Sequence, residues 1–479
     1  MISFFIHIVR KLTIRQLIIW QAMLLLSGCA DMNGIGTQSR PLDPARLSAG
    51  NAIQTADLVA WPNQQWWTAC HDVQLDRLVA QAVAGSPRLQ TARDRIALAQ
   101  AIAQGQHAGL GPQLGIDASA SRDRFTDLQF IPPPWAGNTY WNNSVAASLS
   151  WDLDLWGRQK ANWQAALDEA SAASIDAEEV RIELETAIVR SYFRLALAYA
   201  RRDVARARLD DLQEKLVIER QGEQAGLATQ LAISSAEDPL PLARAELSAA
   251  DEAIAHLKNE LAALAGTGPG AMDHLQRPQP VLNAPIGLPD HLPAHLLGRR
   301  PDISAQRLRV EAGMQRIHAA RAAFYPDVNL NAMAGFQAIG FAQWLSQAAL
   351  MTGAGPAISL PLFDSGRRRA GLSVATSTRD LAVDQYNETV VQALRDVADQ
   401  LVAFRSATRQ QEQAESAVQN ARHTLALATE AWRAGLSDER LVLAARDKEL
   451  AAQTALDEYN ARRLDSWARL MLALGGGSQ

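Results

Sequence analysis

The sequence predicts a mostly helical chain that also carries two β-hairpins and is built from two similar halves. Three observations predict this fold class: segments in which apolar and small polar residues alternate, two long stretches almost without helix breakers, and motifs that recur at a fixed distance. Of the 479 residues, 48% are hydrophobic and 20% are charged, which excludes a disordered chain. The net charge of −5 leaves no basic footprint, so we expect no nucleic-acid partner.

The N-terminus has the pattern of an export signal. Basic residues precede a short apolar run, which ends at Leu26-Ser27-Gly28-Cys29. This pattern is typical of a secretory signal, and the apolar run is too short to span a bilayer as a helix. Its end resembles the bacterial lipobox, which predicts a signal peptide at 1–28 and a diacylglycerol and an N-acyl lipid, such as palmitate, on Cys29. The alternative is an ordinary signal with an incidental cysteine, and for Cys70 we expect the role of a small apolar filler.

Motifs recur along the chain at a constant offset. Ala225-Gly226-Leu227 matches Ala434-Gly435-Leu436 at an offset of 434 − 225 = 209, and the same offset aligns 149–158 with 358–367. Repeated matches at one offset indicate an internal duplication. We therefore divide the mature chain into an N-terminal lipidated and equatorial segment (29–85), a first repeat (86–266), a Pro- and Gly-rich equatorial connector (267–298), a second repeat (299–475) and a tail (476–479).

The alternating segments predict one hairpin in each repeat, at about 113–153 and about 327–363. On 141–153 the odd positions are mainly apolar and the even positions are small or polar, and the other segments keep two unlike faces. This period of two is typical of a strand between lipid and water. Trp141 and Trp151 lie on the same apolar face and would stand roughly 23 Å apart in height. This separation matches the two aromatic girdles of a membrane-spanning strand. The alternative is a pair of hairpins packed on a soluble core.

Four strands are too few to close a transmembrane barrel, and a sheet edge open to lipid is not tolerated. Several copies must then complete one barrel together. Two copies supply eight strands, whose side chains nearly fill the interior, whereas three copies supply twelve and leave an aqueous lumen. The need for a lumen favours a trimer.

The stretches without helix breakers are too long for a compact globule. Residues 157–222 and 366–434 would each form a helix of about 100 Å. On the first stretch, Tyr192 belongs to one apolar stripe and Phe193 to another, which indicates neighbours on both sides or, alternatively, a buried aromatic core. Pro239 and Pro241 interrupt the returning helix of the first repeat, so we expect a break there that the second repeat lacks.

Several motifs resemble the outer-membrane factor (TolC-like) family, in its lipoprotein branch of multidrug efflux channels. They cover nearly the whole mature chain: Gln65-Trp66-Trp67, Arg299-Arg300-Pro301-Asp302, Ala323-Phe324-Tyr325-Pro326, Phe363-Asp364-Ser365-Gly366-Arg367 and Leu474-Gly475-Gly476-Gly477. The resemblance implies a homotrimer with a twelve-strand barrel in the outer membrane, continued by a long α-helical barrel across the periplasm. It also implies a periplasmic adaptor (membrane-fusion) protein that links the channel to an inner-membrane pump of the RND or MFS type.

The two Ala-Gly-Leu sites should form turns between consecutive helices, because glycine tolerates positive φ. The resemblance places Gly226, Leu227, Gly435 and Leu436 at the far periplasmic end and implies that the adaptor docks there. The alternative is that the glycines serve only the turns.

The gate at that end should depart from the family pattern. Many members carry acidic residues six and nine positions after the second glycine, where this chain has Leu441 and Ala444. We therefore assign the gate region to the nearby charges of Asp438, Glu439 and Arg440. Further along the chain from the last strand, the three arginines at 367–369 either face anionic headgroups or start a solvated helix.

No motif predicts an enzyme. His291 and His295 have a metal-compatible spacing, but Pro293 lies between them and a third ligand is not evident, so we expect no metal and no cofactor besides the lipid on Cys29. The predicted function is a passive duct for drugs or other small toxic compounds. A type I protein-secretion duct shares this architecture, and a periplasmic coiled-coil scaffold would use only the long helices. The exported compounds depend largely on the pump.

Overall fold

The computed structural model describes residues 32–43, 47, 61–128, 130–282 and 298–477. The chain divides into two compact units. The first comprises Met1–Pro41, Arg95–Ala173 and Gln306–Tyr386, and the second comprises Leu42–Asp94, Ser174–Ala305 and Asn387–Gln479. Each repeat therefore contributes residues to both units.

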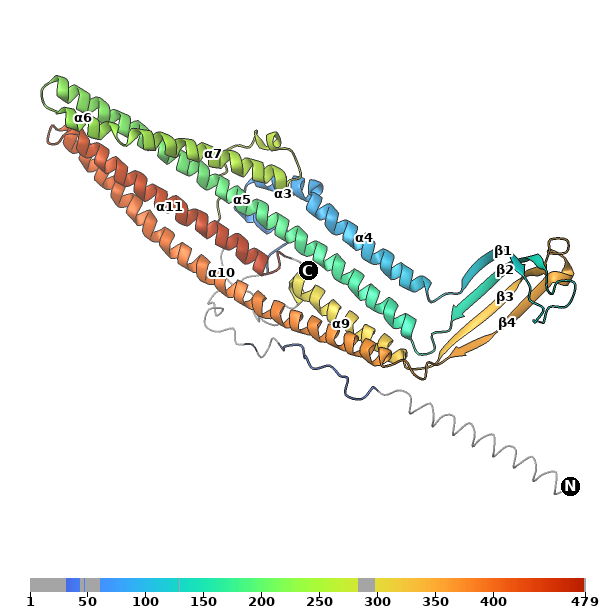
Figure 1. The fold of residues 1–479 in the computed structure, drawn as a ribbon. Helices are drawn as coiled ribbons and strands as arrows, with labels where there is room; N and C mark the ends of the chain where they lie inside the picture. Colours follow the sequence, from blue (N-terminus) through green and yellow to red (C-terminus); the bar gives the residue numbers. More distant parts are fainter. Residues whose placement is uncertain (1–31, 44–46, 48–60, 129, 283–297, 478–479) are drawn as a thin grey trace. The chain divides into compact units, whose positions relative to one another are not determined.

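The first unit contains a four-stranded antiparallel sheet (Figure 1). Its strands lie in the order β1 (Gln113–Arg124), β2 (Thr139–Asp152), β3 (Asp327–Ile339) and β4 (Leu350–Ser359). β2 of the first repeat pairs directly with β3 of the second, so the two expected hairpins are confirmed and form one sheet. The outer edges of this sheet are β1 and β4.

The register gives the sheet one apolar and one polar face. Leu149 on β2 lies opposite Leu114 on β1 and Ala332 on β3, and direct neighbours across strands share a face. On the other face, the hydroxyls of Ser119 and Ser144 are 2.7 Å apart. Leu114 is exposed, so the apolar face is not covered by a core as the alternative would require.

Strand β4 ends at Ser359, before the alternation in the sequence does. Leu360 and Leu362 therefore belong to the segment that leads to the next helix. Pro361 explains the early end, because it has no amide hydrogen to donate to a neighbouring strand.

Four helices adjoin the strands. α4 (Pro87–Ala108) precedes β1, α5 (Arg158–Gln224) follows β2, α9 (Pro301–Ala322) precedes β3 and α10 (Arg367–Arg433) follows β4. In the first unit an extended N-terminal segment also lies along α10, where the Gln38 amide donates to Asp380 at 2.8 Å and the Ser39 hydroxyl donates to Asp384 at 3.1 Å.

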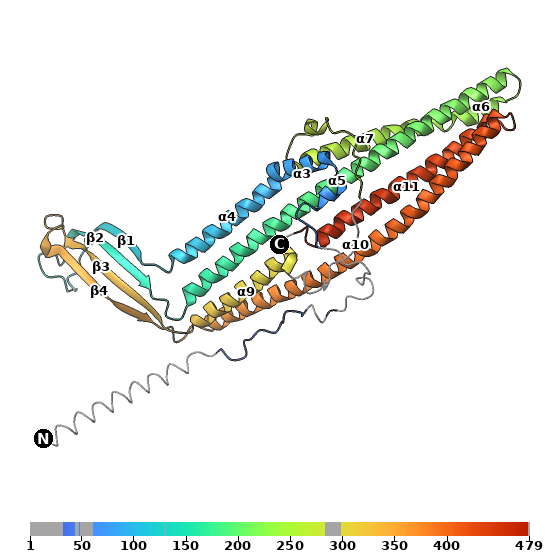
Figure 2. The same ribbon diagram turned by 180° about the vertical axis from the view of Figure 1, so that it is seen from behind.

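The second unit consists mainly of antiparallel helix pairs (Figure 2). α5 returns through α6 (Gln230–Glu237) and α7 (Leu240–Leu264), and α10 returns as α11 (Glu439–Ala473). Asp238 and Pro239 separate α6 from α7 whereas α11 is continuous, which confirms the predicted difference between the repeats. None of the described helices combines the length and apolar character needed to cross a bilayer.

The largest core of the second unit forms where α5 meets α7, α11 and three short elements, η2 (Trp66–Cys70), α3 (Val73–Gly85) and η3 (Pro269–Met272). Tyr192 and Phe193 are buried in it, and the ring of Trp66 makes an edge contact with Trp467 at 5.2 Å. The Tyr192 hydroxyl donates to Asp72 at 2.7 Å, and Asp72 also caps the N-terminus of α3. Both apolar stripes of α5 thus enter one buried aromatic core. This is the second of the two arrangements that the sequence of this stretch allows.

Candidate functional site

In each helix pair of the second unit a tight turn joins the outgoing helix to the returning one. We call these two turns the tip turns. Gly226, with φ of 70°, joins α5 to α6, and Gly435, with φ of 72°, joins α10 to α11. The amide of the next residue donates to a carbonyl five residues back, at 2.7 Å for Leu227 and 2.8 Å for Leu436. A left-handed residue with this bond ends a helix in a Schellman motif, which favours glycine.

Each tip turn presents one leucine outward. Leu227 is 84% exposed and Leu436 is 82% exposed. The next helix begins at once in both turns, with the Thr229 hydroxyl capping α6 and the Asp438 carboxylate capping α11. Because caps fix the backbone on both sides of the leucine, the exposed side chain sits on a well-defined turn.

The expected gate residue Arg440 meets a partner that the sequence did not reveal. Its guanidinium donates two hydrogen bonds to Glu219 on α5, Nε to Oε1 at 2.7 Å and Nη2 to Oε2 at 2.8 Å. The side chain of Glu219 is only 7% exposed, whereas that of Arg440 is 46% exposed. The bidentate bond raises the pKa of Arg440 and ties α11 to α5 within one copy.

The other two expected gate residues serve the start of α11. Asp438 accepts a hydrogen bond from the Leu441 amide at 3.2 Å and lies 3.6 Å from Arg440. Glu439 lies in the first turn, where a negative charge suits the helix dipole. The structure therefore brings Asp438 and Arg440 together and gives Glu439 a separate, local role.

A groove of about 520 Å³ lies beside the Glu219–Arg440 pair, among α5, α7 and α11. Arg446 on α11 donates to Asp211 on α5 at 2.6 Å. Burial raises the pKa of Asp211 although this bond lowers it, and the same bond raises the pKa of Arg446. Ala444 lines the groove and Leu441 is exposed, so these two positions supply no carboxylate to the groove.

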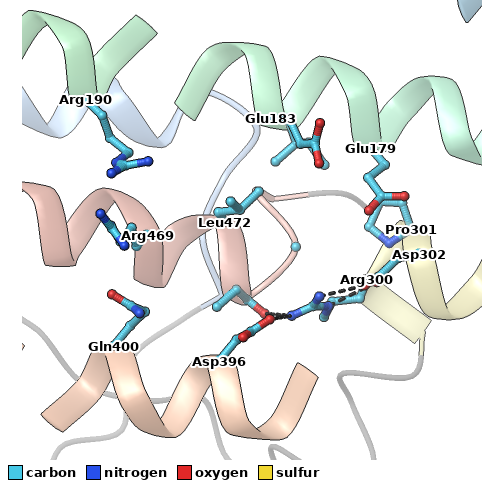
Figure 3. A pocket seen from close by; sticks show the side chains of 13 residues that line it. Glu179, Glu183, Arg190, Arg300, Pro301, Asp302, Asp396, Gln400, Arg469 and Leu472 are labelled. Atoms are coloured by element: carbon cyan, nitrogen blue, oxygen red, sulfur yellow. Dashed lines mark hydrogen bonds and ion pairs between the residues drawn. The ribbon is translucent and has the colours of Figure 1, made fainter. Parts of the chain in front are cut away.

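A cavity of about 340 Å³ lies elsewhere in the second unit, lined mostly by charged residues near or on α5, α9, α10 and α11 (Figure 3). There Arg300 bonds to both carboxylate oxygens of Asp302, at 3.0 and 2.6 Å. The same guanidinium donates to the carbonyl of Ala473, the last residue of α11, at 3.2 Å, and lies 3.5 Å from Asp396 on α10. Arg300 thus joins three helices at one point, a role that the motif alone did not reveal.

Glu179 on α5 also lines this cavity (Figure 3). Burial, followed by the charges of Asp302, Glu183 and Asp176, raises the pKa of Glu179 to about 7, while Arg300 acts in the opposite direction. A carboxyl with a raised pKa binds its proton more tightly in the folded protein. Its favourable contribution to stability is therefore complete below the ordinary pKa of 4.5 and is lost as pH rises through 7.

This sign predicts a pH-dependent effect of Glu179→Gln. We expect the variant to be more stable than the wild type at pH 8, by about 1 kcal/mol because the side chain is partly solvated, and nearly equal to it at pH 4.5. Thermal unfolding of both proteins across this pH range measures the difference. Glu388→Gln, at an exposed side chain of α10 that accepts a hydrogen bond from the neutral Gln392 at 3.0 Å, is the control and should show no such trend. A difference for Glu179→Gln that is constant with pH would contradict the assignment.

The two expected girdle tryptophans are both exposed on β2. The ring of Trp141 contacts the ring of Phe341 at 5.8 Å, and the Trp151 indole donates to the Leu110 carbonyl at 2.9 Å. These contacts orient both rings. Their contact with lipid stays a prediction.

The remaining sequence-based candidates are two cysteines and two histidines. Cys29, the expected lipid-attachment residue, lies outside the described residues, as do His291 and His295. Cys70 is a buried free thiol, and burial, followed by the charges of Asp72 and Asp76, raises its pKa to about 12. Such a thiol is unreactive. Within the described part of the chain, no group of three or more His, Cys, Asp or Glu side chains is placed to hold a metal ion.

Comparison with known proteins connects this geometry to a family. The family model described as "Outer membrane efflux protein" matches residues 78–267 and 292–476, which is more than half of the chain. The chain is 41% identical over 362 residues to the "Fusaric acid resistance protein FusA" of Burkholderia cepacia, covering 74% of this chain and 68% of that protein. It is 29% identical over 470 residues to the "Multidrug resistance outer membrane protein MdtP" of Escherichia coli strain K12, covering 95% and 94%.

Solved structures show the same fold. The outer membrane protein VceC of Vibrio cholerae has a TM-score of 0.80 at 33% identity, with 88% of this chain and all of that chain covered. The outer membrane channel CmeC of Campylobacter jejuni has a TM-score of 0.84 at 20% identity, with coverage of 93% and 95%, and supports the fold alone. The two ranges of the family match follow the two repeats. The chain therefore belongs to the outer membrane efflux protein family and is an efflux channel of the outer membrane.

Proposed function

We propose that three copies of this chain form one passive duct through the outer membrane. The observation that carries the proposal is the four-stranded sheet, which is apolar on one face, polar on the other, and bounded by β1 and β4. An edge open to lipid would leave backbone groups without hydrogen bonds, so these edges must pair with further copies. Three copies supply twelve strands, which enclose an aqueous lumen lined by the polar face.

The duct exports drugs or other small toxic compounds, delivered by an inner-membrane pump and a periplasmic adaptor. The names of the relatives support this substrate class, because one confers fusaric acid resistance and another multidrug resistance. The pump supplies the energy. This chain contributes a polar path, the tip turns on which the adaptor docks, and a gate at the Glu219–Arg440 pair.

A lipid on Cys29 anchors each copy. Met32, three residues after Cys29, packs with Phe324 and Leu372, close to the start of β3. That position supports an anchor at the helical end of the sheet, where the membrane surface would lie. Labelling with a palmitate analogue should mark the wild type and not Cys29→Ser, and equal labelling of both would contradict the anchor.

Two experiments test the duct itself. The purified protein should run as a trimer in native mass spectrometry and give stepwise conductance in planar bilayers, whereas a periplasmic scaffold would give none. A deletion strain should become sensitive to small toxic compounds. If it instead lost export of secreted proteins and kept its drug tolerance, the chain would be a type I secretion duct.

Docking at the tip turns predicts a specific effect of Leu436→Asn. The side chain is exposed, so the substitution should leave the melting temperature unchanged while it weakens adaptor binding at least tenfold in a pull-down titration. Leu128→Asn is the matched control, because Leu128 is even more exposed (95%) but lies between β1 and β2. Unchanged adaptor affinity in Leu436→Asn and in the equivalent Leu227→Asn would contradict docking at these turns.

A further inference from the structure

We propose that the two turns between the sheet and its following helices bind phosphate-bearing headgroups of membrane phospholipids. We call this surface the junction belt. Its residues are Leu155, Trp156 and Lys160 in the first repeat and Leu362, Phe363 and Arg367 in the second. The inference extends the proposed function, because it names a lipid that the channel holds and not a compound that it exports.

The belt exposes large apolar side chains in both repeats. Phe363 is 88% exposed and Leu362 is 70% exposed, and Leu155 and Trp156 are also exposed. The ring of Trp156 is nevertheless held in place, since it stacks on Tyr325 at 4.7 Å and its indole donates to the Pro326 carbonyl at 2.8 Å. A fixed, half-exposed tryptophan beside exposed leucines is typical of side chains at the boundary between acyl chains and headgroups.

The same two turns lead directly into basic residues. Two of the arginines are used inside the fold, because Arg158 pairs with Asp152 and Asp327 at 3.0 Å and Arg368 pairs with Asp364 at 2.7 Å.

Lys160 and Arg367 are exposed, one in each repeat. Among the described residues, no acidic side chain pairs with either of them. An exposed cation beside exposed apolar side chains complements a phosphate that sits above acyl chains. The carboxylates of Asp154 and Asp364 in the same turns are engaged within the fold, because they accept hydrogen bonds from the first amides of α5 and α10.

The belt continues the face that is expected to meet lipid. Leu153 follows β2 with the parity of Leu149 and Trp151, and Leu360 follows β4 with the parity of Ile358. The belt thus lies where the apolar face ends and charge begins, as at a bilayer surface. This continuity and the charge complementarity favour a phospholipid as the occupant over an acidic protein.

The experiment measures which lipids the full-length protein retains. The protein in detergent is mixed with equal amounts of phosphatidylglycerol and phosphatidylcholine, and the bound lipids are counted by native mass spectrometry. We expect the wild type to prefer phosphatidylglycerol and the variant Lys160→Gln/Arg367→Gln to lose that preference by roughly fivefold for each cation. Arg93→Gln/Arg395→Gln, at exposed arginines of α4 and α10, is the matched control and should keep it.

Three results of the lipid measurement would overturn the proposal. They are equal retention of the two lipids by the wild type, an unchanged preference in the double variant, and complete release of phosphatidylglycerol by inorganic phosphate, which would make the belt a site for the free ion. Loss of adaptor binding with unchanged lipid retention would identify a protein-binding surface instead and would also overturn it. Conductance in planar bilayers keeps these outcomes separate from a failure of the duct, because the double variant should conduct like the wild type.

Discussion

Replacing Arg300 with alanine is expected to destabilise the protein by about 3–5 kcal/mol. The Arg300 side chain is 13% exposed and holds Asp302, the Ala473 carbonyl and Asp396 together. Alanine would leave the Asp302 carboxylate and the last carbonyl of α11 without this donor. The stability of Arg300→Lys should lie between that of the wild type and that of Arg300→Ala. An ammonium group keeps the charge but cannot reproduce the two parallel bonds to Asp302.

The measurement is the apparent melting temperature in detergent at one fixed heating rate, since membrane oligomers often unfold irreversibly. Arg395→Ala is the matched control on α10. Its side chain is 77% exposed and pairs with Asp399 one turn away at 3.2 Å, so its loss should cost under about 0.5 kcal/mol. If the two alanine variants melted at the same temperature, Arg300 would not be the joint that the geometry indicates.

Local patterns allowed much of the fold to be predicted from the sequence. The alternation along 141–153 specifies a strand with two unlike faces, because side chains point to opposite sides at each step. Pro239 predicts a break between two helices for an equally local reason, the missing amide hydrogen. The pairing of β2 with β3 was not predictable in this way. It joins strands of different repeats, so it depends on how the two hairpins lie side by side and not on a local pattern.

The same distinction between local patterns and long-range contacts applies to the candidate site. The tip turns are visible in the sequence because glycine at positive φ is a local requirement and the motif occurs twice. Glu219 carries no such signal, because 221 residues separate it from Arg440 and only the register of α5 against α11 brings them together. Arg300 stands in a motif that indicates the family, but its contact with Ala473 depends on where α11 ends.

On the proposed function, breaking the Glu219–Arg440 pair is expected to open the gate of the duct. The pair joins α5 to α11 and so links the two helix pairs of one copy, and Arg440→Gln would leave the nearly buried Glu219 carboxylate without its partner. Hydrogen bonds to charged groups contribute about 1.5–3 kcal/mol, which is roughly tenfold or more in an equilibrium between closed and open tips. The open fraction of single channels in planar bilayers measures this change. Glu219→Gln, Arg440→Gln and the double variant should all raise the open fraction. Arg440→Gln should raise it most, because it alone leaves the nearly buried Glu219 carboxylate without a partner.

A second ion pair provides a control that distinguishes opening of a gate from a general loss of helix stability. Arg422 on α10 pairs with Glu449 on α11 at 3.1 Å, so this pair lies inside one helix pair and does not link it to the other. If the tip opens by separation of the two helix pairs, Arg422→Gln should leave the open fraction unchanged although it, too, removes an Arg–Glu hydrogen bond, here a single one at 3.1 Å. An equal increase in Arg422→Gln would mean that any weakening of these helices opens the duct. Opening confined to the Glu219 and Arg440 variants would instead show that the barrier lies between the helix pairs, in a chain whose Leu441 and Ala444 supply no acidic ring.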